Sequence, residues 1–167
     1  VHSIDTPALV VDLDAMERNI ATMAAFAHTH QIAWRPHAKL HKSAELALLL
    51  VQAGAVGACV QKTSEAEALV AGGVTDIYIS NEVISLSKLQ RVAHMARALE
   101  AKNGQISIAV DSVEGIRRLA AALDKVHVSM RVFVEIDVGQ NRCGVQPGPA
   151  AVALAQEVQR HPRLHFA

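Results

Sequence analysis

The sequence contains almost nothing that would place the protein in a membrane, outside the cell or on nucleic acid. Only Cys59 and Cys143 are cysteines, so no disulfide framework of a small secreted domain can form. Basic and acidic residues both number 16, which indicates no polyanionic partner. The longest apolar runs, such as Ala47–Val51, are far shorter than the ~20 residues of a membrane-spanning helix, and no secretory leader opens the sequence. We expect a cytoplasmic protein.

Hydrophobic residues make up 51% of the 167 residues, which is enough for one sizeable core. Their periodicity alternates between strand and helix, and this alternation is typical of a parallel sheet covered by helices. Strands are predicted at 8–11, 35–41, 56–61, 76–80, 106–111, 130–138 (the longest) and 164–167. Helices are predicted to begin at Asp12 or Asp14, at Ser43, at Ser64 with Glu67 as a capping box, near Leu86, at Ser112 and after Gly148.

The two faces of each predicted strand differ, and this favours a barrel over an open sheet. In 130–138 one face carries Val132, Val134, Ile136 and Val138, which are all branched and apolar, whereas Phe133, Glu135 and Asp137 share the other. Central strands of an open parallel sheet should be apolar on both faces. We therefore predict an α/β fold, a partial (β/α)8 TIM-type barrel. About six strands are present against the eight that closure needs, so we expect the front part of a longer enzyme, cut at about the sixth strand.

A polar residue closes the mixed face of five strands: Lys39, Gln61, Ser80, Asp111 and Asp137. In a barrel these carboxyl ends meet at one mouth, where such barrels keep their active sites. The alternative is that each residue only forms a turn or caps a helix. Both interpretations remain open at this point.

The stretch Arg35–Lys42 (RPHAKLHK) is the most unusual segment of the sequence. A strand would put Arg35, His37, Lys39 and His41 on one face, and a lysine between two histidines suits the wall of an active site. Lys42 has the opposite parity. A solvated basic turn or a nuclear-localisation-like basic run would explain the same residues.

Five segments together resemble a known family. They are DTPALVVDLD (5–14), RPHAK (35–39), QKTSEA (61–66), ISNEV (79–83) and VEIDVGQNRCGV (134–145). In order and spacing they resemble the D-threonine aldolase and D-3-hydroxyaspartate aldolase family, within the alanine-racemase-like (fold type III) pyridoxal-phosphate enzymes. The second and fifth segments are the specific ones.

The resemblance implies a set of site residues. Lys39 would be the catalytic lysine and carry pyridoxal 5'-phosphate as a Schiff base, a reaction that needs an unprotonated amine. Arg142 would hydrogen-bond the phenolic oxygen of the cofactor, for which a permanently charged guanidinium is suited. Alternatively, Arg142 is a loop arginine that pairs with Asp137 or Glu135. Gln61 and Asn81 would line the cofactor pocket. His37 and His41 receive no role, and no metal ligand is expected within this chain.

The resemblance also implies the reaction and the partners. We expect retro-aldol cleavage of D-β-hydroxy-α-amino acids to glycine and an aldehyde, assisted by Mn, Mg or Zn held by ligands outside this chain, in a homodimer. Residues 1–12 would form a strand pairing with an absent C-terminal β-domain, and 13–167 an incomplete cofactor-binding barrel that is inactive alone. The alternatives are a D-serine dehydratase, which makes pyruvate, and a non-catalytic pyridoxal-phosphate carrier.

Overall fold

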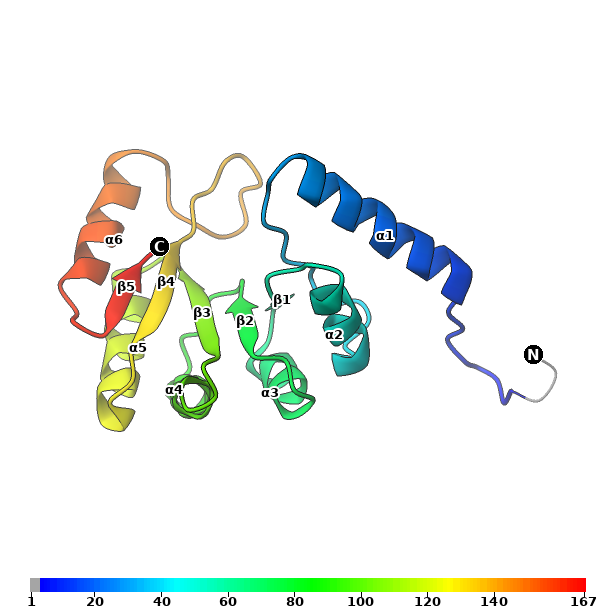
Figure 1. Ribbon diagram of the computed structural model, residues 1–167. Coiled ribbons are helices and arrows are strands. Elements are labelled where there is room, and N and C mark those ends of the chain that lie inside the picture. The colour runs from blue at the N-terminus through cyan, green and yellow to red at the C-terminus, as the bar shows by residue number, and fades with distance from the viewer. Residues whose placement is uncertain (1–3) are drawn as a thin grey trace.

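Five parallel strands form one sheet in which every strand lies beside the next one in the sequence (Figure 1). They are β1 (Ala58–Val60), β2 (Asp76–Ile79), β3 (Gln105–Val110), β4 (Met130–Val134) and β5 (Leu164–Phe166). The structure is a computed structural model and describes residues 4–167. Sequential parallel order is the order of strands in a (β/α) barrel, so the predicted partial barrel is confirmed.

Helices connect the strands along one face of the sheet (Figure 1). After α1 (Leu13–Thr29) and α2 (Ala44–Gln52), each of the next four helices joins two neighbouring strands: α3 (Thr63–Ala71), α4 (Leu86–Glu100), α5 (Val113–Val126) and α6 (Pro149–Gln159). Among the described residues, no helix combines the length and apolar composition needed to cross a bilayer.

The core lies between this helical layer and alternate residues of the strands. Ile77, Ile79, Ile108 and Val132 belong to the buried cluster that includes Leu89 and Leu119 of the helices. Their strand neighbours Tyr78, Ser107 and Phe133 are outside that cluster and occupy the opposite face. This is the division into two faces that the sequence predicts, because successive side chains of a strand point in opposite directions.

Most helix starts follow the sequence prediction, but one is wrong. The side chains of Asp12, Ser43 and Ser112 accept backbone N–H bonds at the first turns of α1, α2 and α5. Helix α3 begins at Thr63 rather than after Ser64, and the carboxylate of Glu65 accepts the N–H groups of Gln61 and Lys62. Glu67 instead pairs with Arg91 of α4. The N-cap of α3 is therefore Lys62, two residues before the predicted Ser64.

One predicted strand is absent and several are shorter than expected; β1, for example, covers only Ala58–Val60 of the predicted 56–61. Residues 8–11 form no strand, because their backbone finds no partner among residues 4–167. The 35–41 segment is extended only to His37, which bridges Cys59, and turns at Ala38. Strand β4 ends at Val134 rather than Val138, since Ile136 leaves the sheet and bridges Val145. The longest strand is β3, with six residues.

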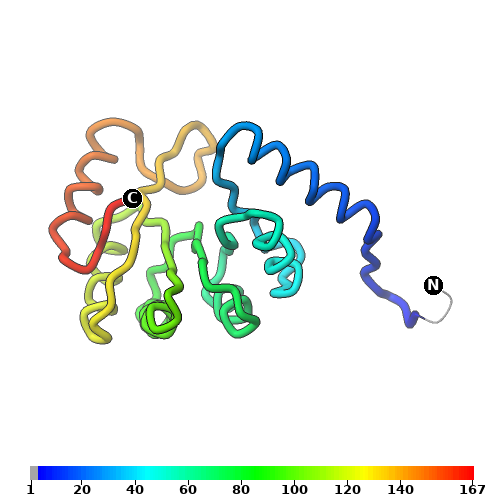
Figure 2. The backbone as a smooth tube through the Cα atoms, in the orientation of Figure 1, coloured from blue at the N-terminus to red at the C-terminus, as the bar shows by residue number. Residues whose placement is uncertain are grey.

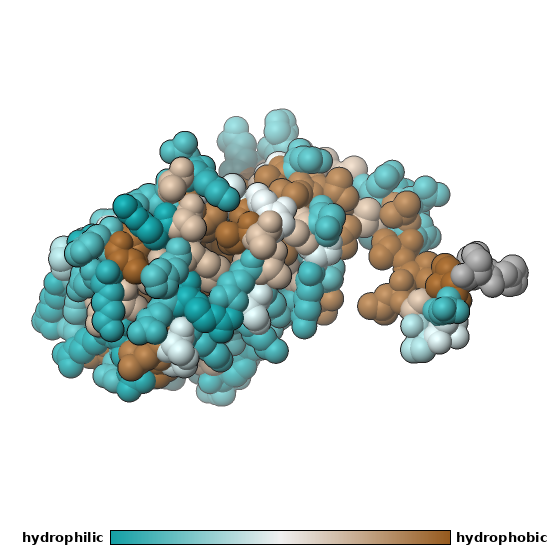
Figure 3. All heavy atoms as spheres, turned by 90° about the horizontal axis from the view of Figure 1, so that it is seen from below, coloured by the Kyte–Doolittle hydropathy of each residue, from teal (hydrophilic) through white to brown (hydrophobic). Residues whose placement is uncertain are grey.

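The N-terminal segment and α1 extend away from the sheet (Figure 2). Leu9, Val10 and Leu13 are largely exposed, and Ala27 is the one buried residue of α1. Figure 3 shows this apolar surface on the projecting part of the molecule. The barrel prediction is consistent with this exposure, because an incomplete barrel leaves apolar surface without a cover.

A polar chain ties the first strands together at their amino ends. The Arg35 guanidinium donates to Asp76 Oδ1 at 2.7 Å, and Gln105 Nε2 donates to Asp76 Oδ2 at 2.6 Å. Gly57 lies against this chain with φ +153°, and a Cβ there would collide with Arg35 Nη1 and the Asp76 carbonyl oxygen. Only glycine therefore permits the close approach of β1 to β2 at this point.

We predict that Gly57→Ala destabilises the full-length protein more than Gly54→Ala. Both glycines have positive φ, so both variants strain the backbone, but nothing lies within 4 Å of a Cβ at Gly54. The added collision at Gly57 should cost about 1–3 kcal/mol in the free energy of unfolding. Urea unfolding midpoints measure the difference, and equal midpoints for the two variants would contradict the packing argument.

Candidate active site

The lysine segment runs beside β1 and then turns at the carboxyl edge of the sheet. Cys59 N–H donates to Pro36 O and Ala38 N–H donates to Cys59 O, both at 2.8 Å, so residues 36–38 add an edge to the sheet. A turn follows, closed by Lys42 N–H donating to Ala38 O at 2.8 Å. Lys39 lies on this turn with an exposed side chain. The alternation of side chains predicted for a strand at 35–41 therefore extends only to His37.

His37 holds the turn that presents Lys39. Its Nδ1 accepts the Lys39 backbone N–H at 3.3 Å, which leaves Nε2 to carry the proton of the neutral ring. Nε2 faces Ser80 Oγ at 3.4 Å, and this hydroxyl donates to Val60 O. Burial, and next the charge of Lys39, lower the pKa of His37 below its ordinary value. A neutral ring that accepts a backbone N–H has a structural role.

His41 repeats this arrangement one turn later. Its Nδ1 accepts the Ser43 N–H at 3.1 Å, next to the start of α2, and burial lowers the pKa of His41. Lys42, the competing lysine, lies 3.8 Å from Glu65 Oε1. The Lys39 amine makes no hydrogen bond or ion pair with residues 4–167, so of the two lysines it is the more available to a ligand.

Gln61 and Asn81 line the same hollow at the carboxyl ends of β1 and β2. Lys62, Lys88 and Glu82 also line it, so cations and one carboxylate surround the two amides. The structure thus brings together two of the four predicted site residues. Lys39 and Arg142 lie on other loops of the same edge and contact neither amide through a hydrogen bond in the described part of the chain.

Arg142 lies on a loop that folds back on the end of β4. Val145 N–H donates to Glu135 O at 3.0 Å and Asp137 N–H donates to Val145 O at 2.9 Å, which fixes the base of the loop. Gly144 has φ +92°, and a Cβ would lie 2.7 Å from Asp137 N, so the base requires glycine. Asp111 at the end of β3 accepts the Gly144 N–H at 3.3 Å.

The interior of the same loop is organised by Asp137. Its Oδ1 accepts the N–H groups of Gly139 at 2.9 Å and Asn141 at 3.0 Å. These bonds, that of Asn141 first, lower the pKa of the Asp137 carboxyl. Asp137 therefore forms a turn, as the alternative interpretation of the polar strand ends predicts. Arg142 pairs with neither Asp137 nor Glu135 in a salt bridge between described residues, and its side chain is exposed.

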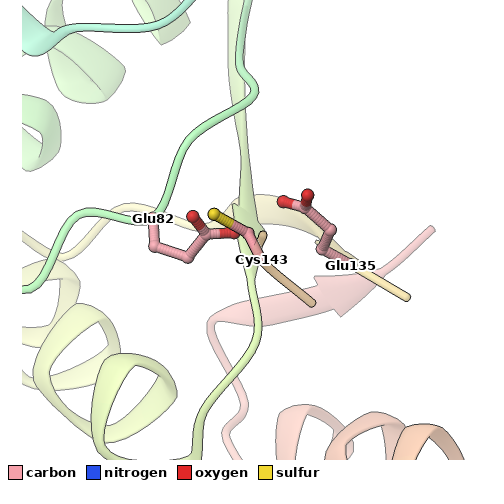
Figure 4. Close-up of side chains that lie close together, drawn as sticks. All are labelled: Glu82, Glu135 and Cys143. Carbon is pink, nitrogen blue, oxygen red and sulfur yellow. The ribbon is translucent and has the colours of Figure 1, made fainter. Parts of the chain in front are cut away.

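Two glutamates and a cysteine that we did not predict as site residues meet at this edge. Glu82 follows β2, Glu135 follows β4 and Cys143 belongs to the Arg142 loop; their side-chain O and S atoms lie within 4.8 Å of one another (Figure 4). The Glu82 carboxyl beside it is the main cause that raises the pKa of Glu135 to about 7, followed by burial. The inward parity of Glu135 was visible in the sequence, but its contact with a residue from another loop was not.

The fold and this edge define the class of the protein: an alanine-racemase-type α/β barrel, of which part is present. Residues 11–167 match the family model of the alanine racemase N-terminal domain, and the chain belongs to that family.

Within that family, the chain is similar to aldolases that are named for D-amino acids. The chain is 43% identical to a D-threonine aldolase of an Arthrobacter species and 40% identical to a 3-hydroxy-D-aspartate aldolase of Paracoccus denitrificans, in both cases over 98% of its length. The crystal structure of a D-threonine aldolase from Filomicrobium marinum superposes with a TM-score of 0.93 at 44% identity, over 98% of this chain and 43% of that one. The chain spans 42% and 41% of the lengths of the two curated relatives. The predicted family resemblance is confirmed.

We predict that Asp137→Ala speeds amide hydrogen exchange in residues 138–145, whereas Asp137→Asn, which keeps an acceptor oxygen, has a smaller effect. Because the folded-state pKa of Asp137 is lowered, the carboxylate stabilises the loop above the ordinary value of about 3.9 and loses this effect as the pH falls through the folded value. After correction for intrinsic exchange rates, the protection of the loop amides should fall at low pH in the parent protein but not in Asp137→Asn. Unchanged exchange in Asp137→Ala would contradict this role.

Proposed function

We propose that the full-length protein is a pyridoxal-phosphate-dependent lyase that cleaves D-β-hydroxy-α-amino acids, D-threonine or a close analogue, to glycine and an aldehyde. The observation that carries the proposal is the presentation of Lys39. Its amine is exposed and unpaired among residues 4–167, on a turn held by His37 at the carboxyl edge of a parallel (β/α) sheet. Active sites of such barrels form at this edge.

The residues at the edge fit pyridoxal phosphate by their chemistry. An amine that no carboxylate neutralises can attack an aldehyde once it is unprotonated. Arg142 has an exposed guanidinium without a salt-bridge partner in the described chain, which suits the anionic phenolic oxygen. Gln61 and Asn81 line the neighbouring hollow and offer amide donors and acceptors to the remaining polar atoms.

Each of these residues has a definite part in the proposal. Lys39 would hold the cofactor covalently through its side-chain amine. Arg142 would donate a hydrogen bond to the phenolic oxygen and stabilise its ionised form, and Gln61 and Asn81 would orient the ring. When bound, pyridoxal phosphate supplies an electron sink for the carbanion that remains when the Cα–Cβ bond breaks. The proton of the β-hydroxyl would pass to a base as that bond breaks, and a divalent metal with ligands outside this chain would supply Lewis-acid polarisation of the same oxygen.

The proposal extends to the assembly of the whole protein. Residues 4–11 have no backbone hydrogen bond among the described residues, so we propose that this segment pairs with a β-domain beyond residue 167, whereas Asp12 caps α1. Residues 1–3 of the same predicted strand lie outside the described part. A homodimer is proposed because members of this superfamily usually build the site across two subunits. The names of the two curated relatives support a D-amino acid with a β-hydroxyl as substrate.

We predict that Lys39→Ala abolishes activity and covalent cofactor attachment, whereas Lys42→Ala retains both. Lys39 is the unpaired lysine of the turn, and Lys42 lies three residues away near Glu65. The measurements are glycine release from D-threonine by the full-length protein and peptide mapping after borohydride reduction. A reduced label on Lys42 or Lys62 would refute the assignment of Lys39.

The same assay separates the alternative functions. Glycine and an aldehyde indicate the aldolase, whereas ammonia and a keto acid from D-serine indicate the dehydratase. Cofactor binding without turnover of either substrate indicates a carrier. Loss of activity with a chelator, reversed by added Mn, Mg or Zn, tests the metal. The dehydratase or carrier outcome would overturn the proposed reaction while leaving the cofactor assignment in place.

We predict that Arg142→Leu weakens cofactor binding and shifts the absorption of the bound cofactor, because the anionic oxygen loses a charged hydrogen-bond donor worth about 1.5–3 kcal/mol. Arg97→Leu is the matched control, since Arg97 is an exposed arginine of α4 whose one ion-pair partner among residues 4–167 is Glu100. Titration of the apoprotein with pyridoxal phosphate, followed by absorbance, gives both readouts. An unchanged spectrum in Arg142→Leu would rule out contact with the oxygen.

A further inference from the structure

The Glu82, Glu135 and Cys143 cluster has no role in the proposed reaction so far. Each residue comes from a segment fixed by the fold: Glu82 from the β2–α4 connection, Glu135 from the end of β4 and Cys143 from the loop closed by Gly144 (Figure 4). All three side chains are partly buried. Cys143 is next to Arg142 in the sequence, so whatever fixes the cluster also fixes the backbone that carries Arg142.

Two ionised carboxylates would be unfavourable in this position. Within residues 4–167, neither Glu82 nor Glu135 forms a salt bridge, and Glu82 Oε1 is buried without a hydrogen-bond donor. Burying a carboxylate oxygen without a donor is costly, as is placing two like charges side by side. A single proton held between the carboxyls removes one charge and supplies a donor, and an oxygen of each carboxyl group lies within 4.8 Å of one of the other.

The charges around Glu135 support one proton in the pair and not two. Glu82 from the loop after β2 and Asp111 from the end of β3 favour the protonated form, whereas the positive charge of Arg142 opposes it. Tyr78 of β2 and the Cys143 thiol are the other titratable groups that interact with Glu135. With one shared proton the pair carries one negative charge, and Arg142 keeps a guanidinium without a salt bridge to either glutamate among residues 4–167.

We propose that Glu82 and Glu135 are a positioning pair for Arg142: the two carboxyl groups share one proton, and this hydrogen-bonded pair sets the charge and the place of the Arg142 loop at the barrel mouth. The inference rests on the proposed function only where it concerns the cofactor. Loss of the shared proton adds a second negative charge beside Arg142, draws the guanidinium into an ion pair with the glutamates and removes it from the cofactor oxygen. The switch falls near pH 7, the value to which the pKa of Glu135 is raised.

The first test uses Cys143 as a reporter and needs no cofactor. Burial, and next the negative charges of Glu82 and Glu135, raise the pKa of the Cys143 thiol. Glu135→Gln keeps a hydrogen-bonding side chain but removes the second charge, so at pH 8 Cys143 of the full-length apoprotein should be alkylated by iodoacetamide about three- to tenfold faster than in the parent protein. Glu82→Gln should have the same effect, and Glu114→Gln, an exposed glutamate of α5 paired with Arg118, should have none.

The second test measures the dissociation constant of pyridoxal phosphate between pH 6 and pH 8.5. The parent protein should bind more weakly as the pH rises through about 7, whereas Glu135→Gln and Glu82→Gln should lack that step. The conservative variants thus rescue binding at high pH, which a merely structural role for the glutamates would not produce.

Outcomes of the two tests can be told apart. Two results would overturn the shared proton. One is an equal alkylation rate at pH 8 in the parent protein and both glutamine variants. The other is an infrared spectrum of the parent protein at pH 6 that shows no protonated-carboxyl band sensitive to Glu135→Gln. If the reporter behaves as expected but the protein binds no pyridoxal phosphate at any pH, the pair stands and the proposed function fails. If binding occurs with the same pH step in all variants, the pair does not position Arg142.

Discussion

The structure depends on the strict alternation of side chains along short parallel strands. One set of alternate residues, including Ile77, Ile108 and Val132, is removed from water by the helices that follow each strand. That burial fixes the register, because a slip of one residue would turn every isoleucine of a strand to the wrong face. With the register fixed, every strand must end at the same edge. The turn with Lys39, the amides Gln61 and Asn81 and the Arg142 loop meet there as a consequence.

The site edge is held mainly by backbone hydrogen bonds and only secondarily by paired charges. His37 accepts the N–H of Lys39, Asp111 that of Gly144, and Asp137 those of two loop residues. These side chains do not neutralise Lys39 or Arg142. Both cations therefore remain available, which is a condition for binding an anionic cofactor. At this edge Lys42 lies 3.8 Å from Glu65, whereas the Arg35–Asp76 ion pair lies at the amino ends of the strands.

Short-range patterns predicted much of this arrangement. Apolar periodicity located the helices and five strands, and the caps at Asp12, Ser43 and Ser112 followed from side chains that accept a bond within three residues. Prediction failed where a partner decided the outcome. Residues 8–11 have strand-like composition but no neighbour in the described chain, and a strand exists only as part of a pair. Strand β4 stops at Val134 because Ile136 finds Val145 instead of continuing beside β3.

Motifs local in the sequence were enough to place Lys39, Gln61, Asn81 and Arg142 at the ends of their elements and to indicate the family. Their mutual arrangement was decided by tertiary structure, as was the difference between Asp137, which folds its own loop, and Glu135, which meets Glu82. The two acidic residues stand two positions apart on one predicted face and are indistinguishable by pattern. What separates them is the partner that each side chain meets, backbone N–H groups for one and a second carboxyl for the other, because charge and burial act through space and not along the chain.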